Sequence, residues 1–327
     1  MDCAAEIIPV EPEADNAAVG NISILYNQQV DNSCIQLQSA FAANPCNSPH
    51  IYETIIMQYR CALTIAGSDS VGGAGIQADI KTMSALGVYA ASAITAVTVQ
   101  NTHGVYGIEA IRPEIVGEQI SAVMDDIHPT AVKIGMVNDA ETIHAIAETL
   151  GKYKGVAVII DPVMVSTSGC RLMQEDALQV FRTELMPLAS LLTPNVPEAE
   201  ILSGIKIETV DDMDRAAGKI CNEAGCAVLV KGGHLDGNTK TDILYADGQR
   251  VETYEALTVE TRNTHGTGCT LSSAITAHLA LGYTMADAIR LAKTYLYKAL
   301  EAGKDVEIGR GHGPVNHFFD PHPYYTK

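Results

Sequence analysis

Basic residues are scarce in this chain of 327 residues. Lys and Arg together number 21 against 39 Asp and Glu, and the formal net charge is −18 at pH 7. Nucleic acids and anionic membranes are bound by basic surfaces, so this charge argues against both as partners. An anionic ligand has to be held by local features, such as helix N-termini and single cations.

Several other signatures are missing. The eight cysteines form no C-x-x-C pair and no regular framework, which favours free thiols in a reducing cytosol over disulfides or a zinc site. No run of 18 apolar residues occurs, and residues 1–30 lack a basic start followed by an apolar stretch. We therefore expect a cytoplasmic protein.

Two common nucleotide-binding motifs are also missing. The phosphate-loop pattern G-x-x-x-x-G-K-S/T is absent, and so is an ordered G-x-G-x-x-G.

Residues 1–56 differ in composition from the rest of the chain. They are acidic and rich in Asn and Gln, with too few regularly spaced apolar residues to bury a core. We predict a disordered N-terminal extension, followed by a single domain over residues 57–327. A regulatory arm is the alternative for the extension, and Met57 is a possible start of translation.

From Cys61 onward, apolar runs alternate with helical patterns. Strands that are apolar throughout and separated by helices indicate a parallel sheet covered on both faces, that is, a three-layer α/β/α sandwich. Ile108–Ile111 and a hairpin over Ile243–Tyr254 are predicted as antiparallel additions. The other predicted strands are Cys61–Ala66, Tyr89–Val99, Ala131–Ile134, Val156–Ile160, Leu191–Thr193, Ala227–Val230 and Tyr254–Thr261. The predicted helices are Gly73–Leu86, Glu114–Ile127, Ala140–Tyr153, Asp176–Leu185, Glu198–Leu202, Val210–Ala224, 267–281 and 284–301.

One stretch, Asn263 to Ser273, combines a glycine turn with the opening of an apolar helix. The first turn of a helix carries unpaired N–H groups and a positive dipole end, so Gly266 to Cys269 should bind an anion such as phosphate. Cys269 lies in that turn, where we expect its thiol to ionise more easily than a free one. The alternative for Cys269 is a small side chain packed against the sheet.

Polar residues follow three of the predicted central strands. Asp161 ends one strand, Asn195 and Glu198 follow the next, and Lys231 ends a third. Carboxylate and amide oxygens suit a hydrated Mg²⁺, and a strand-end Lys suits a phosphate. For Glu198 the alternative is a helix N-terminal charge favoured by the dipole.

Several ordered motifs resemble those of one enzyme family. They are Ala62-Leu63-Thr64-Ile65-Ala66-Gly67-Ser68-Asp69, Gly72-Gly73-Ala74-Gly75-Ile76-Gln77-Ala78-Asp79, Lys231-Gly232-Gly233-His234 and Asn263-Thr264-His265-Gly266-Thr267-Gly268-Cys269. From about Tyr59 to the C-terminus the chain resembles the hydroxymethylpyrimidine/phosphomethylpyrimidine kinases of thiamine biosynthesis, in the ribokinase-like superfamily. The resemblance implies ATP as phosphoryl donor, Mg²⁺, a homodimer, and phosphorylation of the hydroxymethylpyrimidine and then of its monophosphate.

The resemblance also implies roles for individual residues. Gln100 would read the aminopyrimidine edge, while Met136 and Val163 would line the ring pocket. The catalytic set would be Cys269, Gly266, Gly268 and Lys231. The remaining substrate-binding residues would be Gly67, Ala74 and Asp79, the ATP site would comprise Lys231, Thr264, Gly266, Thr267 and Gly268, and the metal would lie near Asn195, Glu198 and Asp161.

Purely structural roles for several of these residues, and other functions for the chain, stay open. Gln100 could cap a strand, Asp79 could be a helix surface charge, and His103, His234 and His265 are expected to brace loops rather than act as bases. Pyridoxal kinase is the alternative enzyme, although Gln100 disfavours it. A non-catalytic pyrimidine or nucleotide sensor is the alternative from another class.

Overall fold

The computed structural model describes residues 57–165, 169, 172–174, 176–233 and 238–326. The predicted disordered extension, residues 1–56, and the predicted loop-bracing role of His234 lie outside the described residues. Within the described part, no helix combines the length and apolar character needed to cross a bilayer.

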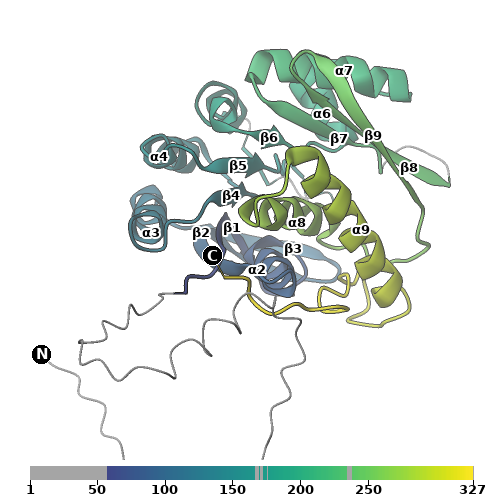
Figure 1. The fold of residues 1–327 in the computed structure, drawn as a ribbon, viewed down its shortest axis with the longest axis horizontal. Coiled ribbons are helices and arrows are strands. Elements are labelled where there is room, and N and C mark those ends of the chain that lie inside the picture. The colour runs from purple at the N-terminus through teal and green to yellow at the C-terminus, as the bar shows by residue number, and fades with distance from the viewer. Residues whose placement is uncertain (1–56, 166–168, 170–171, 175, 234–237, 327) are drawn as a thin grey trace, which may run out of the picture. The chain divides into compact units, whose positions relative to one another are not determined.

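A mixed sheet forms the centre of the described part of the chain (Figure 1). Its strand order is β3-β2-β1-β4-β5-β6-β7-β8-β9, with the strands from β2 to β7 parallel and β3, β8 and β9 antiparallel to their neighbours. The strands are β1 (Cys61–Asp69), β2 (Tyr89–Asn101), β3 (Gly104–Ala110), β4 (Ala131–Ile134), β5 (Ala157–Ile160), β6 (Leu191–Leu192), β7 (Ala227–Lys231), β8 (Thr239–Ala246) and β9 (Gln249–Leu257).

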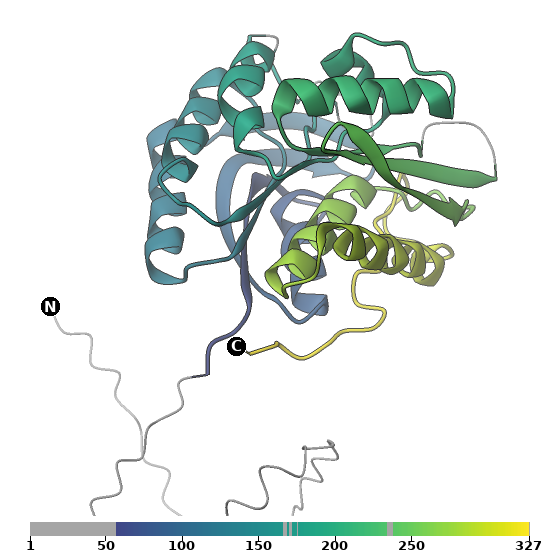
Figure 2. The same ribbon diagram turned by 45° about the horizontal axis from the view of Figure 1, so that its top comes forward.

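Helices cover both faces of the sheet, which confirms the three-layer α/β/α architecture (Figures 1 and 2). Helices α3 to α7 pack on one face around a core that includes Ile134, Ile160 and Val230. Helices α2, α8 and α9 pack on the other face around Ile159, Leu229 and Ile275. The helices are α2 (Gly75–Ala85), α3 (Pro113–Asp126), α4 (Ala140–Leu150), α5 (Ala177–Val180), α6 (Val196–Ser203), α7 (Val210–Ala224), α8 (Thr267–Ala280) and α9 (Met285–Gly303).

The start of α6 is fixed by its own sequence. Asn195 accepts a hydrogen bond from the backbone N–H of Glu198, and the Glu198 carboxylate accepts one from the backbone N–H of Asn195. This capping box satisfies two donors that the first helical turn would otherwise leave unpaired. Gly204 ends the helix in the left-handed conformation. Both capping side chains are thereby held at the edge where β6 ends.

Two sequence predictions about elements were wrong in detail. The strand predicted over Tyr254–Thr261 ends at Leu257, and no strand precedes the glycine turn directly. The helix predicted over Asp176–Leu185 divides into a short α-helix and a π-helical segment, Phe181–Leu185. Both antiparallel additions were confirmed, as β3 and as the β8–β9 hairpin.

Candidate active site

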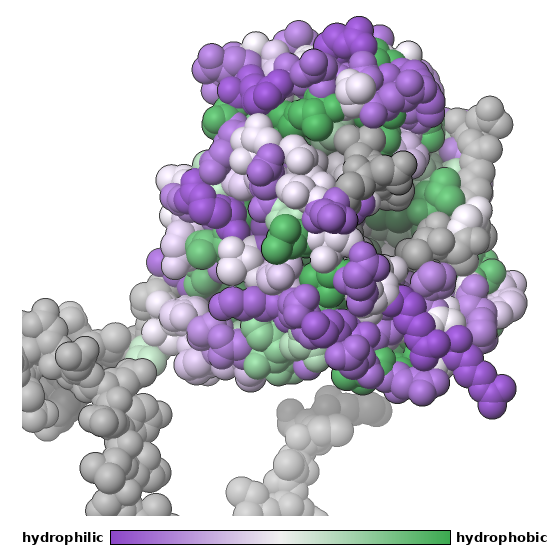
Figure 3. Space-filling view, turned by 90° about the vertical axis from the view of Figure 1, so that its right-hand side faces the viewer, coloured by the Kyte–Doolittle hydropathy of each residue, from purple (hydrophilic) through white to green (hydrophobic). Residues whose placement is uncertain are grey.

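A cavity of about 760 Å³ lies at the carboxyl ends of the parallel strands. Figure 3 looks onto the side that carries β8, β9 and α9, where apolar side chains gather around a hollow. Ligands of open α/β sheets bind at this edge, because the strand ends and helix starts converge there. All the site residues predicted from the sequence line the cavity, with the exception of Asp79: Gly67, Ala74, Gln100, Met136, Asp161, Val163, Asn195, Glu198, Lys231, Thr264, Gly266, Thr267, Gly268 and Cys269.

Asp79 does not reach the cavity. Its side chain is fully buried between α2, β1, β4 and α8, and it forms an ion pair with Lys133. Both expectations for Asp79, a direct substrate contact and a helix surface charge, were therefore wrong. A residue at this helical position is buried or exposed according to what packs on it, and the packing partners come from distant segments.

The start of α8 forms the anion-binding part of the cavity. Gly266 precedes the helix with a φ of +77°, and no side chain caps the first turn. The N–H groups of Gly268 and Cys269 have no carbonyl partner within the helix, because they lie in its first turn. A Cβ on Gly266 would lie 1.8 Å from the carbonyl oxygen of Gly73, so this position admits glycine alone.

Opposite this turn, Lys231 and Asp161 form an ion pair, with 2.7 Å between Nζ and Oδ1. A Cβ on Gly268 would lie 3.3 Å from Asp161 and 3.5 Å from the Lys231 ammonium, which shows how closely both groups approach α8. Burial lowers the pKa of Lys231, but the charges of Asp161 and Glu198 and the hydrogen bond to Asp161 together outweigh it, and the pKa is raised overall. The cation stays charged at neutral pH beside the anion-binding turn.

Glu198 lies near this ion pair and is buried. Burial raises the pKa of the Glu198 carboxyl to about 7. The charge of Lys231 lowers this pKa, and the charge of Asp161 raises it further. Within the described residues, no cluster of three or more His, Cys, Asp or Glu side chains is arranged around a metal position. Mg²⁺ needs few protein ligands when phosphate and water complete its shell. Asp161, Glu198 and the Asn195 amide therefore fit a metal that is held mainly through a nucleotide and water.

The thiol of Cys269 does not follow the sequence expectation. Burial raises the pKa of Cys269 to about 11, while the charge of Lys133 lowers it and those of Asp79 and Asp161 raise it. The prediction of an easily ionised thiol was wrong, because burial outweighs the helix start. The resting side chain is a neutral thiol that faces the cavity.

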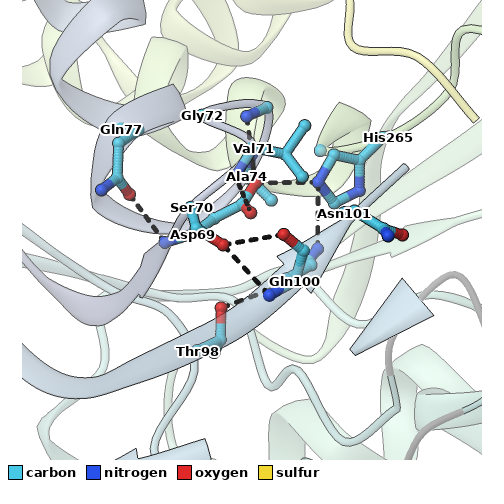
Figure 4. Close-up of polar contacts among 12 residues, drawn as sticks. Asp69, Ser70, Val71, Gly72, Ala74, Gln77, Thr98, Gln100, Asn101 and His265 are labelled. Atoms are coloured by element: carbon cyan, nitrogen blue, oxygen red, sulfur yellow. Dashed lines mark hydrogen bonds and ion pairs between the residues drawn. The ribbon is translucent and has the colours of Figure 1, made fainter. Parts of the chain in front are cut away.

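On the substrate side, a polar network joins β1, β2 and the glycine turn (Figure 4). His265 Nε2 lies 2.8 Å from Asp69 Oδ2 and 3.2 Å from the amide nitrogen of Gln100. Asp69 also accepts hydrogen bonds from the backbone N–H groups of Val71, Gly73 and Ala74. Burial would raise the pKa of Asp69, but the His265 and backbone hydrogen bonds outweigh it and lower the pKa overall. The loop-bracing role predicted for His265 agrees with these contacts.

This network and an apolar wall were missed as site features. Asp69 and His265 are 196 residues apart, and no spacing rule connects them. The wall is formed by residues of β9, of the segment after it and of α9: Leu257, Val259, Leu296, Tyr297 and Leu300. Leu296 and Leu300 are one helical turn apart, and this spacing was the only signal in the sequence for that face.

A more open groove of about 970 Å³ lies between α3 and α4. Its lining includes surface charges such as Glu118, Glu141 and Lys152. It receives none of the strand ends or helix starts described above, so the candidate chemistry belongs to the smaller cavity.

The fold recurs in solved kinase structures. The chain is 49% identical to phosphomethylpyrimidine kinase from Clostridium difficile 630, with a TM-score of 0.66, and the match covers 73% of this chain and 99% of that one. An ADP complex of Bacillus subtilis pyridoxal kinase is 37% identical, with a TM-score of 0.71 over 80% of this chain and 98% of that chain. Fold and site thus define a ribokinase-like small-molecule kinase.

Sequence comparison identifies the family within this class of kinases. A family model described as phosphomethylpyrimidine kinase matches residues 69–316. The hydroxymethylpyrimidine/phosphomethylpyrimidine kinase of Rhizobium meliloti is 52% identical over 258 residues, which are 79% of this chain and 96% of that protein. The chain belongs to the phosphomethylpyrimidine kinase family.

Proposed function

We propose that the protein transfers a phosphoryl group from ATP to 4-amino-5-hydroxymethyl-2-methylpyrimidine, and then a second one to the resulting monophosphate. One observation carries this proposal: a single cavity is lined by Gln100, by Lys231 and by the Gly266–Cys269 turn. The amide of Gln100 offers both donors and an acceptor, which suits a ring nitrogen next to an amino group. The kinship with enzymes of that name supports the same substrate.

In the proposed arrangement the phosphate chain of ATP lies between Lys231 and the start of α8. Phosphoryl transfer depends on positioning and on neutralising charge, and both are supplied by fixed groups here. The N–H groups of Gly268 and Cys269 would receive the phosphoryl oxygens. The apolar wall with Leu257, Leu296 and Leu300 would take the nucleotide base, because it is the apolar surface next to that turn.

A divalent cation fits the oxygen ligands of Asp161, Asn195 and Glu198. When bound, Mg²⁺ would neutralise the charge of the nucleotide phosphates. Glu198 is suited to a metal cation, since burial raises the pKa of its carboxyl to about 7 despite the charge of Lys231, and a further positive charge would favour the ionised form. The capping box holds Asn195 and Glu198 at the edge of the cavity.

The two transfers make different demands on Cys269. The substrate alcohol must lose a proton, and the Cys269 thiolate would accept it as a general base. The monophosphate attacks through a phosphate oxygen. The second pKa of the phosphate group is about 6, so this oxygen is already ionised at neutral pH. We therefore propose that Cys269 is the base of the first transfer, and that it acts in the small fraction of molecules whose thiol is ionised.

A comparison of three substrates tests the proposed function. The rate of ATP consumption should be highest with hydroxymethylpyrimidine and its monophosphate, and Gln100→Ala should raise the KM of both, by about tenfold or more. Pyridoxal at equal concentration tests the alternative suggested by the pyridoxal kinase neighbour. Faster turnover of pyridoxal would contradict the substrate assignment, and no ATP turnover with any of the three would favour a sensor.

Assembly and location are proposals of a coarser kind. We propose a homodimer, supported by the exposed apolar side chains of Val97, Val99 and Tyr106 on the β2–β3 edge of the sheet. A cytoplasmic location is proposed from the cysteine usage. Light scattering tests the first, because it distinguishes one subunit mass from two.

A further inference from the structure

A buried ion pair lies behind the anion-binding turn and outside the cavity. Lys133 comes from β4 and Asp79 from α2, and both side chains are fully buried. The Lys133 ammonium lies 2.9 and 2.8 Å from the two carboxylate oxygens of Asp79. Neither residue lines the cavity, although the resemblance implied a substrate contact for Asp79, and the pair lies between β4, α2 and α8.

Asp79 connects the pair to the catalytic helix. Its Oδ1 accepts a hydrogen bond from Ser273 on α8 at 2.5 Å, and its Oδ2 accepts one from Thr64 on β1 at 2.6 Å. One carboxylate therefore joins α2, α8, β1 and β4. Ser273 follows Cys269 by four residues, so both side chains point from the same face of α8.

The same spacing occurs on α2. Gly75 and Asp79 are four residues apart, and the backbone N–H of Gly75 donates a hydrogen bond to Cys269 while Asp79 receives one from Ser273. Helices α2 and α8 therefore contact each other at two places, Gly75 with Cys269 and Asp79 with Ser273, and the two contacts are one helical turn apart. Lys133 lies next to this contact between α2 and α8. A Cβ at position 135 would lie 2.6 Å from its ammonium nitrogen, so the glycine there leaves room for the Lys133 side chain.

Such a pair is a costly way to fill a core. A buried ion pair loses hydration on both partners, and an apolar pair of similar volume is often at least as stabilising. Attraction between the charges and the hydrogen bonds from Thr64 and Ser273 offset this cost, but they do not by themselves explain why charged residues occupy the position. The groups that face Cys269 are Lys133 from β4, Asp79 from α2, Asp161 after β5 and Lys231 from β7. Lys133 is the cation behind the turn, whereas Lys231 lies in front of it.

We propose that Lys133 is a positioning residue of the phosphoryl-transfer site: fixed by Asp79, it holds α2 and α8 in register and supplies a permanent positive charge behind the Gly266–Cys269 turn. The charge favours an anion at the turn, whether thiolate or phosphoryl oxygen, without touching either. This inference rests on the proposed function for its kinetic consequence, but its electrostatic consequence is independent of any substrate.

The test measures iodoacetamide alkylation of Cys269 against pH, with the modified peptide quantified by mass spectrometry. Lys133→Met should move the midpoint of the profile upward by about one pH unit, because a nearby cation is lost. Asp79→Asn should move it downward, because an anion is lost while Lys133 stays. Thr64→Val is the matched control: it removes a hydrogen bond to the same carboxylate without changing charge, and should leave the midpoint in place.

Opposite shifts are the decisive result, since a purely structural pair would disturb the site in the same direction in both variants. Unchanged midpoints, or shifts of the same sign, overturn the proposal. If Lys133→Met does not fold by circular dichroism, Asp79→Asn alone decides: a downward shift supports the proposal, and an unchanged or raised midpoint refutes it. Lys133→Met should also slow the first transfer by about tenfold with KM for ATP changed less. Absence of kinase activity in the unmodified protein would refute the proposed function while leaving the alkylation result valid.

Discussion

At the scale of single residues, the site is defined by which charges are buried together. Lys231 has Asp161 as partner, Lys133 has Asp79, and Asp69 has His265. Each pair joins segments far apart in the sequence and ends at or behind the cavity. Cys269 is placed among these charges, and its burial keeps the resting thiol neutral.

The neutral thiol leads to a prediction about pH. The pKa of Cys269 is raised to about 11, so below that value the thiolate fraction increases about tenfold per pH unit. The rate of the first transfer should therefore rise with pH between about 7 and 9, whereas the second transfer should be nearly flat in that range. Initial rates with the two substrates under saturating ATP measure both profiles.

Cys269→Ala is the matching variant. It should slow the first transfer more than the second and abolish the rise of the first with pH. Equal slowing of both transfers, or an unchanged pH profile, would exclude Cys269 as the base.

At the scale of elements, the uncapped start of α8 is the central feature. Gly266→Ala would place a methyl group 1.8 Å from the Gly73 carbonyl oxygen and would force a side chain into a φ of +77°. The turn would shift, and loss of aligned N–H donors typically lowers kcat by about 10²–10³. Steady-state kinetics measure the loss.

Gly282→Ala is a useful comparison for that variant, because Gly282 also has a positive φ, of +93°, with no atom within 4 Å of an added Cβ. The backbone strain is of the same kind, but the position is remote from the cavity. It should lower the midpoint of thermal unfolding with kcat nearly unchanged. A comparable loss of kcat in both variants would mean that strain, rather than the anion site, explains the effect.

The elements also show what a sequence can predict. The apolar runs at Ala131–Ile134 and Ala227–Val230 and the glycine turn before α8 were predicted, because burial and turn chemistry are local signals. The environment of Asp79 and the pKa of Cys269 were not, because both depend on groups brought in by β4, β5 and a neighbouring helix. The capping box of Asn195 and Glu198 lies between these cases: its spacing is local, but its place at the cavity is not.

At the scale of the whole molecule, the described residues from 57 onward contain the sheet, both helical layers and the cavity. We propose that they form the complete catalytic unit. A chain that begins at Met57 should keep kcat and KM for both transfers within about twofold of the full chain. A loss of activity with retained circular dichroism would show that activity depends on the first 56 residues, as expected for a regulatory arm.

The most direct measurement is a crystal structure of the protein with a non-hydrolysable ATP analogue, Mg²⁺ and hydroxymethylpyrimidine. We predict the terminal phosphate within about 2.7–3.1 Å of the Gly268 and Cys269 N–H groups, the hydroxymethyl group beside the Cys269 sulfur, and the ring against Gln100. A triphosphate bound away from the start of α8, with Cys269 separated from both ligands, would contradict the mechanism.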